Sequence, residues 1–319
     1  MSESDMGGRN VAPNSLEGPE QSTAEGAAVQ RSAERIVGSS ETTQRVIEQA
    51  TGAARGNSTI LLVGASGTGK LHLARAIHSW SARAGRPLVV FSATGSPASR
   101  QSEELFGRAD QPGAITNAGE GTLIVKGADD LSSSVCAELA RAIQQGNYRL
   151  DGSAEAQPLR CRILMTSASG DVPGAQARID VPALSERAED IPALAAQFLA
   201  TVAHENGLQP VGFTPEARRW LVDEPWPGNV RELQERVRQA LLLAGNGAIS
   251  IEALMLSNDG DEVPSFKEAK RAFETRYVES LLRRCRGNIS RAARLAKKDR
   301  KDFYDVIRRT GVNPQEFRT

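Results

Sequence analysis

The chain has 319 residues, of which 39% are apolar and 4% aromatic, and its 39 basic and 39 acidic residues leave no net charge. This composition is typical of a water-soluble α/β protein, and the length allows two domains. No apolar run approaches the ~18 residues of a membrane-spanning helix, and the start "MSESDMGGRN" is not a signal peptide. The three widely spaced cysteines indicate neither a zinc site nor a disulfide framework, so we expect a reducing compartment, the cytoplasm, and no membrane contact.

Charge is divided unevenly along the chain. From residue 264 onward there are 16 Lys and Arg but 7 Asp and Glu, so this segment carries +9 and the remainder −9. A basic tail on an acidic body points to nucleic acid at one end, although a basic face is also compatible with simple solvation.

The first two thirds of the chain alternate between helical and strand patterns. Residues 1–30 are polar and rich in Ser, Gly, Glu and Pro, which predicts a disordered leader. Four short apolar runs follow, within "STILLVG", "RPLVVFSA", "GTLIVK" and "RCRILMTSA". Such runs, separated by helical patterns, predict buried parallel strands in a helix-covered open sheet.

From about residue 190 helical periodicity replaces the strands, which predicts a smaller helical lid docked on the sheet. The polar, acidic stretch 257–264 predicts a linker. We therefore expect one domain over 31–256 and a second over 265–319.

A phosphate-binding loop is the clearest motif. "GASGTGK" lies between a predicted strand and a predicted helix in the G-x-x-x-x-G-K arrangement, in which backbone N–H groups, the helix N-terminus and Lys70 surround phosphate oxygens. Leu71 stands where Ser or Thr would hold magnesium, and leucine cannot coordinate a cation. We expect ATP or ADP to contact Gly64, Gly67, Thr68, Gly69, Lys70 and Leu71.

A family resemblance extends this interpretation. "GASGTGKLHLARAIH", "EELFG", "GTLIV", "VPALSERAEDIPALAAQFL" and "WPGNVREL" occur in the order found in the AAA+ domain of sigma-54-dependent transcription activators, the bacterial enhancer-binding proteins, over residues 36–256. The resemblance implies an AAA+ P-loop parallel sheet with a helical lid, a ring-forming oligomer and RNA polymerase as a partner. It also places Arg231 at the lid's nucleotide-sensing arginine, although a surface salt bridge would explain that residue as well.

The acidic pair that this family uses for hydrolysis is missing. By resemblance its Asp and Glu fall on Lys126 and Gly127, where Asp would support magnesium and Glu would activate water. A lysine ~6 Å from a divalent cation implies repulsion of about 5 kcal/mol at an effective dielectric of about 20. We therefore expect no magnesium in the usual pose. Lys126 either points outward or replaces part of the cation's charge, and Asp129 and Asp130 either substitute for the acids or open the next helix.

Other family features are reduced as well. The resemblance aligns the sensor asparagine with Ala168 and leaves Arg178 as the candidate for the arginine finger. The G-A-F-T-G-A loop with which the family grips the sigma factor is replaced by a shorter segment containing "PGAIT". These losses imply an ATP-binding domain without catalytic residues and without rapid hydrolysis.

The basic tail predicts one long amphipathic helix ending at Gly287, followed by two short helices in the helix-turn-helix outline. "GNISRAARLA" and "DRKDFYDVIRRTGV" closely resemble the Fis-type domain that ends enhancer-binding proteins, with Lys297 replacing the usual turn glycine. The resemblance implies double-stranded DNA as ligand and a dimer through this domain. We expect base contacts from Arg300, Lys301 and Tyr304, and phosphate contacts from Arg291, Lys297, Lys298 and Arg308.

These observations predict a sequence-specific DNA-binding transcriptional regulator whose AAA+ domain binds nucleotide but is deficient in hydrolysis, and which does not activate sigma-54 polymerase by itself. We expect a homo-oligomer: a dimer, a ring, or a ring mixed with complete relatives. Two alternatives stay open, namely an ATP-hydrolysing sigma-54-dependent activator and a nucleotide-sensing adaptor whose main ligand is another protein.

Overall fold

The computed structural model describes residues 36–150, 153, 155–210, 212–257 and 266–317. The predicted leader, 1–30, and all but the first residue of the predicted linker, 257–264, lie outside the described residues.

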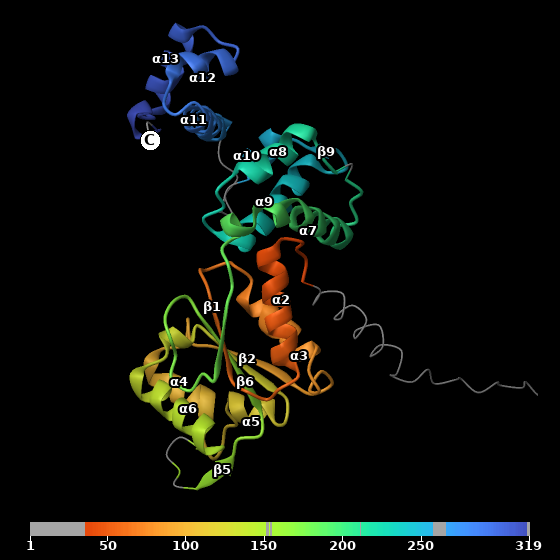
Figure 1. Ribbon diagram of the computed structural model, residues 1–319, viewed down its shortest axis with the longest axis vertical. Helices are drawn as coiled ribbons and strands as arrows, with labels where there is room; N and C mark the ends of the chain where they lie inside the picture. Colours follow the sequence, from red (N-terminus) through yellow and green to blue (C-terminus); the bar gives the residue numbers. More distant parts are fainter. Residues whose placement is uncertain (1–35, 151–152, 154, 211, 258–265, 318–319) are drawn as a thin grey trace, which may run out of the picture. The chain divides into compact units, whose positions relative to one another are not determined.

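A five-stranded parallel sheet forms the centre of the nucleotide domain (Figure 1). Its spatial order is β2-β3-β6-β1-β7. The strands are β1 Ile60–Val63, β2 Leu88–Ser92, β3 Thr122–Lys126, β6 Arg162–Ser167 and β7 Ala177–Asp180. The first four confirm the four predicted runs. The edge strand β7 was not predicted because it is exposed at all but one of its positions and so lacks an apolar run.

Helices cover both faces of this sheet (Figure 1). α2 Glu41–Ala54 and α3 Lys70–Ser79 pack on one face through a core that includes Ile124. α4 Ala98–Phe106, α5 Ala114–Ala118 and α6 Ser133–Gln145 pack on the other through a core that includes Leu123 and Val125. Neighbouring residues of β3 thus serve opposite cores, as the two-residue period of a strand requires.

Short elements complete the domain. The 3-10 turn η1, Ala128–Asp130, follows β3 directly. A small antiparallel hairpin joins β4 Asn147–Arg149 to β5 Ala156–Pro158. Strands of this length carry too few residues to show a period, so the sequence offered no sign of them.

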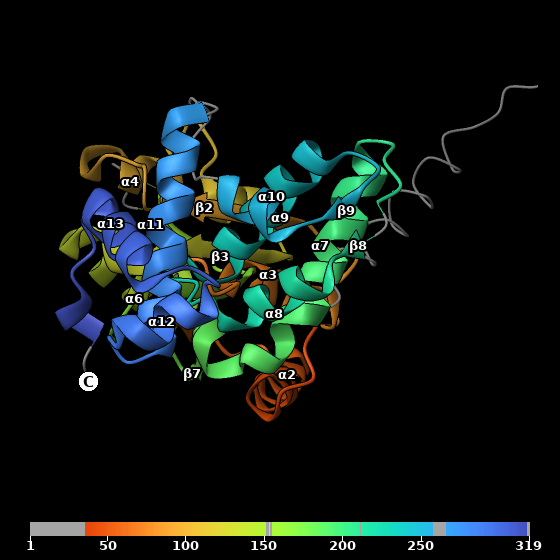
Figure 2. The same cartoon turned by 90° about the horizontal axis from the view of Figure 1, so that it is seen from above.

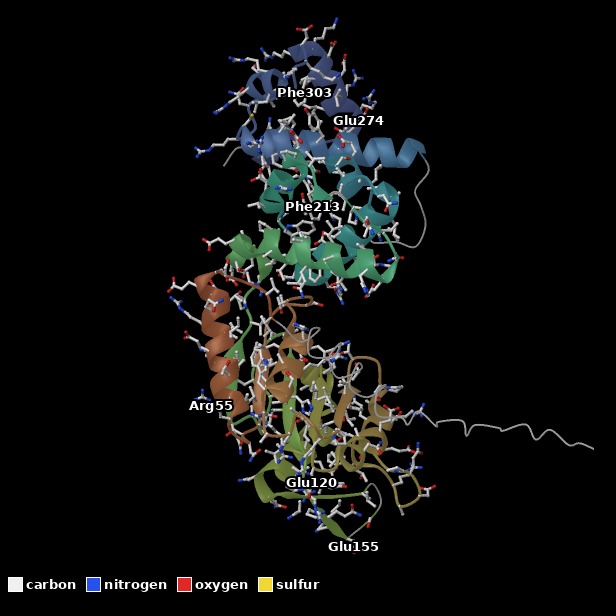
Figure 3. The ribbon with its side chains drawn as sticks, turned by 90° about the vertical axis from the view of Figure 1, so that its right-hand side faces the viewer. Arg55, Glu120, Glu155, Phe213, Glu274 and Phe303 are labelled. Carbon is white, nitrogen blue, oxygen red and sulfur yellow. The ribbon has the colours of Figure 1, made fainter. Side chains whose placement is uncertain are left out.

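The lid has its own core. It consists of η2 Leu184–Asp190, α7 Ile191–Glu205, α8 Pro215–Asp223, α9 Asn229–Ala244 and α10 Ile251–Leu256. Trp226 and Phe213 are buried in this core, and Figure 3 shows Phe213 among the lid helices. The expectation that strands cease at residue 190 is wrong in detail, because β8 Gly212–Phe213 pairs in parallel with β9 Ala248–Ile249.

The C-terminal helices form a separate small core. α11 Phe266–Arg284, α12 Ile289–Leu295 and α13 Arg300–Thr310 lie beside one another (Figure 2), and η3 Pro314–Phe317 follows. Phe303 lies between these helices and is 1% exposed (Figure 3). None of the described helices is long and apolar enough to cross a membrane.

A buried carboxylate ties the start of α2 to the lid hinge. Asp190 is fully buried and accepts hydrogen bonds from the backbone N–H groups of Ser39 and Ser40, at 2.7 and 2.8 Å, and from the hydroxyls of Ser40 and Thr43, at 2.8 and 2.6 Å. Burial alone would raise the pKa of Asp190, but these hydrogen bonds outweigh it and lower the pKa. The carboxylate therefore stabilises the fold while it is ionised.

The contribution of the Asp190 carboxylate to the free energy of unfolding should depend on pH, and replacing the carboxylate tests this. Asp190→Asn places an amide N–H₂ group among hydrogen-bond donors, so we expect a loss of about 3 kcal/mol of unfolding free energy at pH 7. Because the folded pKa is depressed, the wild type keeps this contribution above about pH 4 and loses it as the pH falls further. Urea denaturation at pH 7 and pH 3 should show the two proteins converging at low pH. An equal gap at both values would contradict the assignment.

Candidate nucleotide site and DNA-binding surface

The P-loop connects β1 to α3 in the form that binds phosphate. Gly67 and Gly69 have φ of 79° and 100°, the left-handed region that glycine enters without strain. Gly69 is the N-cap of α3, and no described side chain caps this helix. The first N–H groups of α3 are therefore available to an anion at a positive helix end.

Lys70 is folded back onto the loop that precedes it. Its Nζ donates to the carbonyl oxygens of Gly64 at 2.5 Å and Ala65 at 2.8 Å. Burial lowers the pKa of Lys70, and the charge of Asp129 partly opposes that effect. The buried Thr68 also donates to the carbonyl of Ala65, at 2.9 Å. A phosphate group would offer Lys70 stronger acceptors than these carbonyls.

The two positions at which magnesium would be held do not fit that ion. Leu71 is half-buried and packs against the core beneath α3. Lys126 is the exposed last residue of β3. Its side chain lies on the α3 face of the sheet, because Thr122 on that strand contacts His78 of α3 and side chains alternate between faces. Neither Leu71 nor Lys126 supplies an oxygen ligand.

The backbone after Lys126 disfavours the second family acid. Gly127 has φ of 68°, and a Cβ placed on it would lie 2.1 Å from Oγ1 of Thr94. That hydroxyl, on an exposed side chain, donates to Asp130 at 2.6 Å. A glutamate at position 127 would therefore be strained and would require the Thr94 side chain to move away from Asp130.

Asp129 and Asp130 both lie in the first turn of the 3-10 helix η1, which directly follows the left-handed Gly127. The helix that they open is this short turn, since the next α-helix, α6, begins at Ser133. The carboxylate of Asp129 accepts from the backbone N–H of Ala168 at 2.9 Å. Its negative charge also acts on Lys70, where it partly opposes the lowering of the pKa by burial.

The lid is hydrogen-bonded to three consecutive carbonyls of the P-loop. Each donor comes from a residue that follows the sheet in sequence, and each acceptor is a main-chain oxygen. The bonds run from Nδ2 of Asn229 to Ser66 at 3.0 Å, from the N–H of Arg231 to Gly67 at 3.2 Å, and from Nη2 of Arg187 to Thr68 at 2.7 Å. The lid backbone also lies directly against the P-loop, because a Cβ on Gly67 would lie 2.1 Å from the carbonyl oxygen of Gly228.

Arg231 therefore lies at the P-loop. Its Nη2 is 3.3 Å from Oγ of Ser66, and no carboxylate in the described chain is within ion-pair distance. The geometry favours a site residue over a surface salt bridge. Arg187 and Asn229 are site-forming residues that the sequence reasoning missed. Both are buried polar residues, and burial of a polar side chain cannot be recognised in one sequence.

The remaining family positions are differently arranged. Arg178 lies exposed on β7 and forms ion pairs with Asp171 and Asp180 at 2.9 and 2.7 Å. Its pKa is raised by the hydrogen bonds that its guanidinium donates to these two carboxylates. Between α4 and α5, where the sigma-gripping loop was expected to be reduced, residues 107–113 form a tight turn closed by a bridge between Gly107 and Pro112.

The last α-helix of the basic tail, α13, presents a charged outer face. Asn288 caps α12 by accepting from the N–H of Arg291 at 3.1 Å, and Phe303 and Ile307 bury the inner face of α13. Lys297 has φ of 51°, the conformation that the usual turn glycine would adopt. All the residues predicted to contact DNA are exposed: Arg291, Lys297, Lys298, Arg300, Lys301, Tyr304 and Arg308.

Comparisons with known proteins agree with this arrangement. Residues 36–173 match the model of the sigma-54 interaction domain, and residues 185–270 match that of the AAA+ ATPase lid domain. Transcriptional regulatory protein GlrR of Escherichia coli (strain K12) is 32% identical over 312 residues, covering 89% of this chain and 70% of that protein. ZraR of Escherichia coli O157:H7 is 32% identical over 300 residues, covering 85% and 68%.

Solved structures show the same similarity. The crystal structure of NtrX from Brucella abortus in complex with ATP superposes with a TM-score of 0.70 at 26% identity, covering 92% of this chain and 73% of that one. The complex of the same protein with ADP gives a TM-score of 0.69. Fold, motif order and these matches together show that the chain belongs to the family of sigma-54-dependent transcriptional regulators, the bacterial enhancer-binding proteins.

Proposed function

We propose that this regulator binds ATP or ADP in its P-loop, hydrolyses ATP at most very slowly, and binds a specific DNA duplex through its C-terminal helices. One observation carries the hydrolysis part: β3 ends in Lys126 and is followed by a left-handed Gly127, so neither position supplies a carboxylate. The family's metal-holding and water-activating acids are thus replaced by a cation and a constrained glycine.

Nucleotide binding is supported by the P-loop itself. Its backbone has the glycine conformations that aim N–H groups at phosphate, and Lys70 would neutralise β- or γ-phosphate charge. Arg231 lies at the same loop and would add a second cation. The crystallised complexes of NtrX with ATP and ADP support the same role in a relative. When bound, magnesium would bridge phosphate oxygens, but neither Leu71 nor Lys126 fits it.

A second candidate is an ATP-hydrolysing activator, as the family match favours. Asp129 is the observation in its support, because this carboxylate lies close enough to Lys70 to raise the pKa of its ammonium and is oriented by the N–H of Ala168. In this alternative Asp129 takes over the role of the missing acids. The tight turn at 107–113 speaks against the alternative, since it leaves no projecting loop there to engage a sigma factor.

DNA is the proposed partner of the C-terminal helices. The exposed first turn of α13 carries Arg300 and Lys301, and Tyr304 follows one turn later at 55% exposure. Such a helix places its N-terminal side chains against base edges in the major groove. We further propose a dimer through this domain, and an AAA+ ring of its own or mixed with complete relatives that gives it access to RNA polymerase.

Phosphate release separates the two candidates. We expect the full-length protein to release phosphate from ATP at the background rate, with and without its DNA, and Lys70→Ala to leave that rate unchanged. The same substitution should weaken binding of a fluorescent ADP analogue by roughly 10–100-fold, because it removes a charged hydrogen-bond donor. Lys126→Asp should not create activity, since Gly127 still excludes the second acid.

Brisk hydrolysis that disappears in Lys70→Ala would establish the second candidate. Asp129→Asn, tested in that event, should then abolish hydrolysis if this carboxylate is the substitute acid.

DNA recognition is tested by a matched pair of double variants. Arg300→Ala with Lys301→Ala should weaken specific binding by at least ~30-fold, since each removed base contact is worth about 1–3 kcal/mol. Arg100→Ala with Arg141→Ala removes the same charge from α4 and α6 and should leave the affinity unchanged. Gel-shift titration at two salt concentrations measures both. An unaltered footprint of the first variant would remove the recognition-helix assignment.

A further inference from the structure

We propose that Asn229 is a positioning residue of the nucleotide site, which orients the P-loop for phosphate and couples its occupancy to the lid hinge at Leu184. This inference rests on the proposed nucleotide binding. It adds the route by which bound nucleotide could change the position of the lid without rapid hydrolysis.

A single side chain joins the two parts. Asn229 is 4% exposed at the start of α9. Its Oδ1 accepts from the backbone N–H of Leu184 at 2.8 Å, and its Nδ2 donates to the carbonyl of Ser66 at 3.0 Å. Leu184 is the first residue of η2, where the chain passes from the sheet into the lid. The amide therefore bridges the P-loop to the hinge by two direct hydrogen bonds.

Peptide planarity converts a held carbonyl into an oriented N–H group. In a trans peptide the C=O of one residue and the N–H of the next point in opposite directions within one plane. The lid holds the carbonyls of Ser66, Gly67 and Thr68, and so directs the N–H groups of the three following residues away from the lid donors. These N–H groups belong to the loop that receives phosphate. Phosphate occupancy and lid position are consequently linked through shared peptide planes.

The backbone around this amide is held in an unusual conformation. Asn229 and Trp226 have φ of 57° and 47°, which non-glycine residues rarely adopt. Trp226 is locked by burial and by donation from its Nε1 to the carbonyl of Leu221 at 2.8 Å. Asparagine tolerates this conformation and provides both a donor and an acceptor. Aspartate and glycine tolerate it too, but aspartate lacks the donor and glycine lacks both groups.

This difference gives a test in which backbone strain is kept constant. Asn229→Asp keeps the acceptor for Leu184 but loses the bond to Ser66, and Asn229→Gly loses both. Ser250→Ala serves as the control, because it removes a lid cap that Ala253 uses at 3.3 Å and touches no P-loop residue. Each full-length variant is measured by titration with a fluorescent ADP analogue and by hydrogen exchange without nucleotide.

We expect both Asn229 variants to weaken binding of the analogue about tenfold. Exchange should accelerate over residues 64–72 in both, and at the amide of Leu184 in Asn229→Gly. Ser250→Ala should leave both readouts unchanged. Binding and P-loop exchange that match the wild type in Asn229→Asp would overturn the proposal. If the wild type binds no analogue, the proposed function fails, and unchanged exchange in Asn229→Gly would then overturn the coupling separately.

Two glycines test the same coupling without touching Asn229. Gly67 and Gly69 both have positive φ, but a Cβ on Gly67 would meet the lid carbonyl of Gly228, whereas nothing lies within 4 Å of one on Gly69. Gly67→Ala should therefore displace the lid and accelerate exchange at Leu184 severalfold, and Gly69→Ala should not. Equal exchange at Leu184 in the two variants would contradict a direct contact between lid and loop.

Discussion

The hydrogen bonds from the lid to three consecutive P-loop carbonyls are the constraint on which the nucleotide domain depends. They join a loop that follows β1 to residues more than a hundred positions later, and they fix the loop's peptide planes. Because the donors Arg187 and Asn229 are buried, water does not compete with them for the same oxygens. The phosphate-binding loop and the lid therefore form one unit, and Asp190 extends this unit to the start of α2.

The P-loop and its contacts with the lid are present, but the residues at the end of β3 differ from those that the family carries there. The resemblance aligns Lys126 with the family's acidic metal ligand, and a Cβ on Gly127 would lie 2.1 Å from Oγ1 of Thr94. Asp129 is returned to the site by the η1 turn and contacts the N–H of Ala168. A domain with an intact phosphate loop, an intact lid contact and a rebuilt catalytic edge is suited to holding nucleotide, and the lid is the part that would respond to it.

Much of the fold could be predicted from local patterns. The apolar runs of β1, β3 and β6 are continuous because both faces of these strands are buried, whereas the edge strand β2 is apolar although it is buried at one position only; the P-loop follows β1 with its glycines in place. The sequence could not indicate β7, which is mostly exposed, or the β8–β9 pair, whose residues show no period. The sequence left open whether Asp129 and Asp130 open the next helix, and the structure places both in the short η1 turn after the left-handed Gly127.

The amino-acid sequence by itself determined the family, the order of the motifs, the phosphate loop and the basic C-terminal helix, because each is encoded by residues close together in the chain. Only the tertiary structure decided that Arg187 and Asn229 hold the P-loop, that Asp129 accepts from the N–H of Ala168, and that a Cβ at position 127 would meet Thr94. The physical reason is that each of these facts is a contact between distant segments. Burial, hydrogen bonding and close backbone approach exist there only once the lid and the sheet have packed.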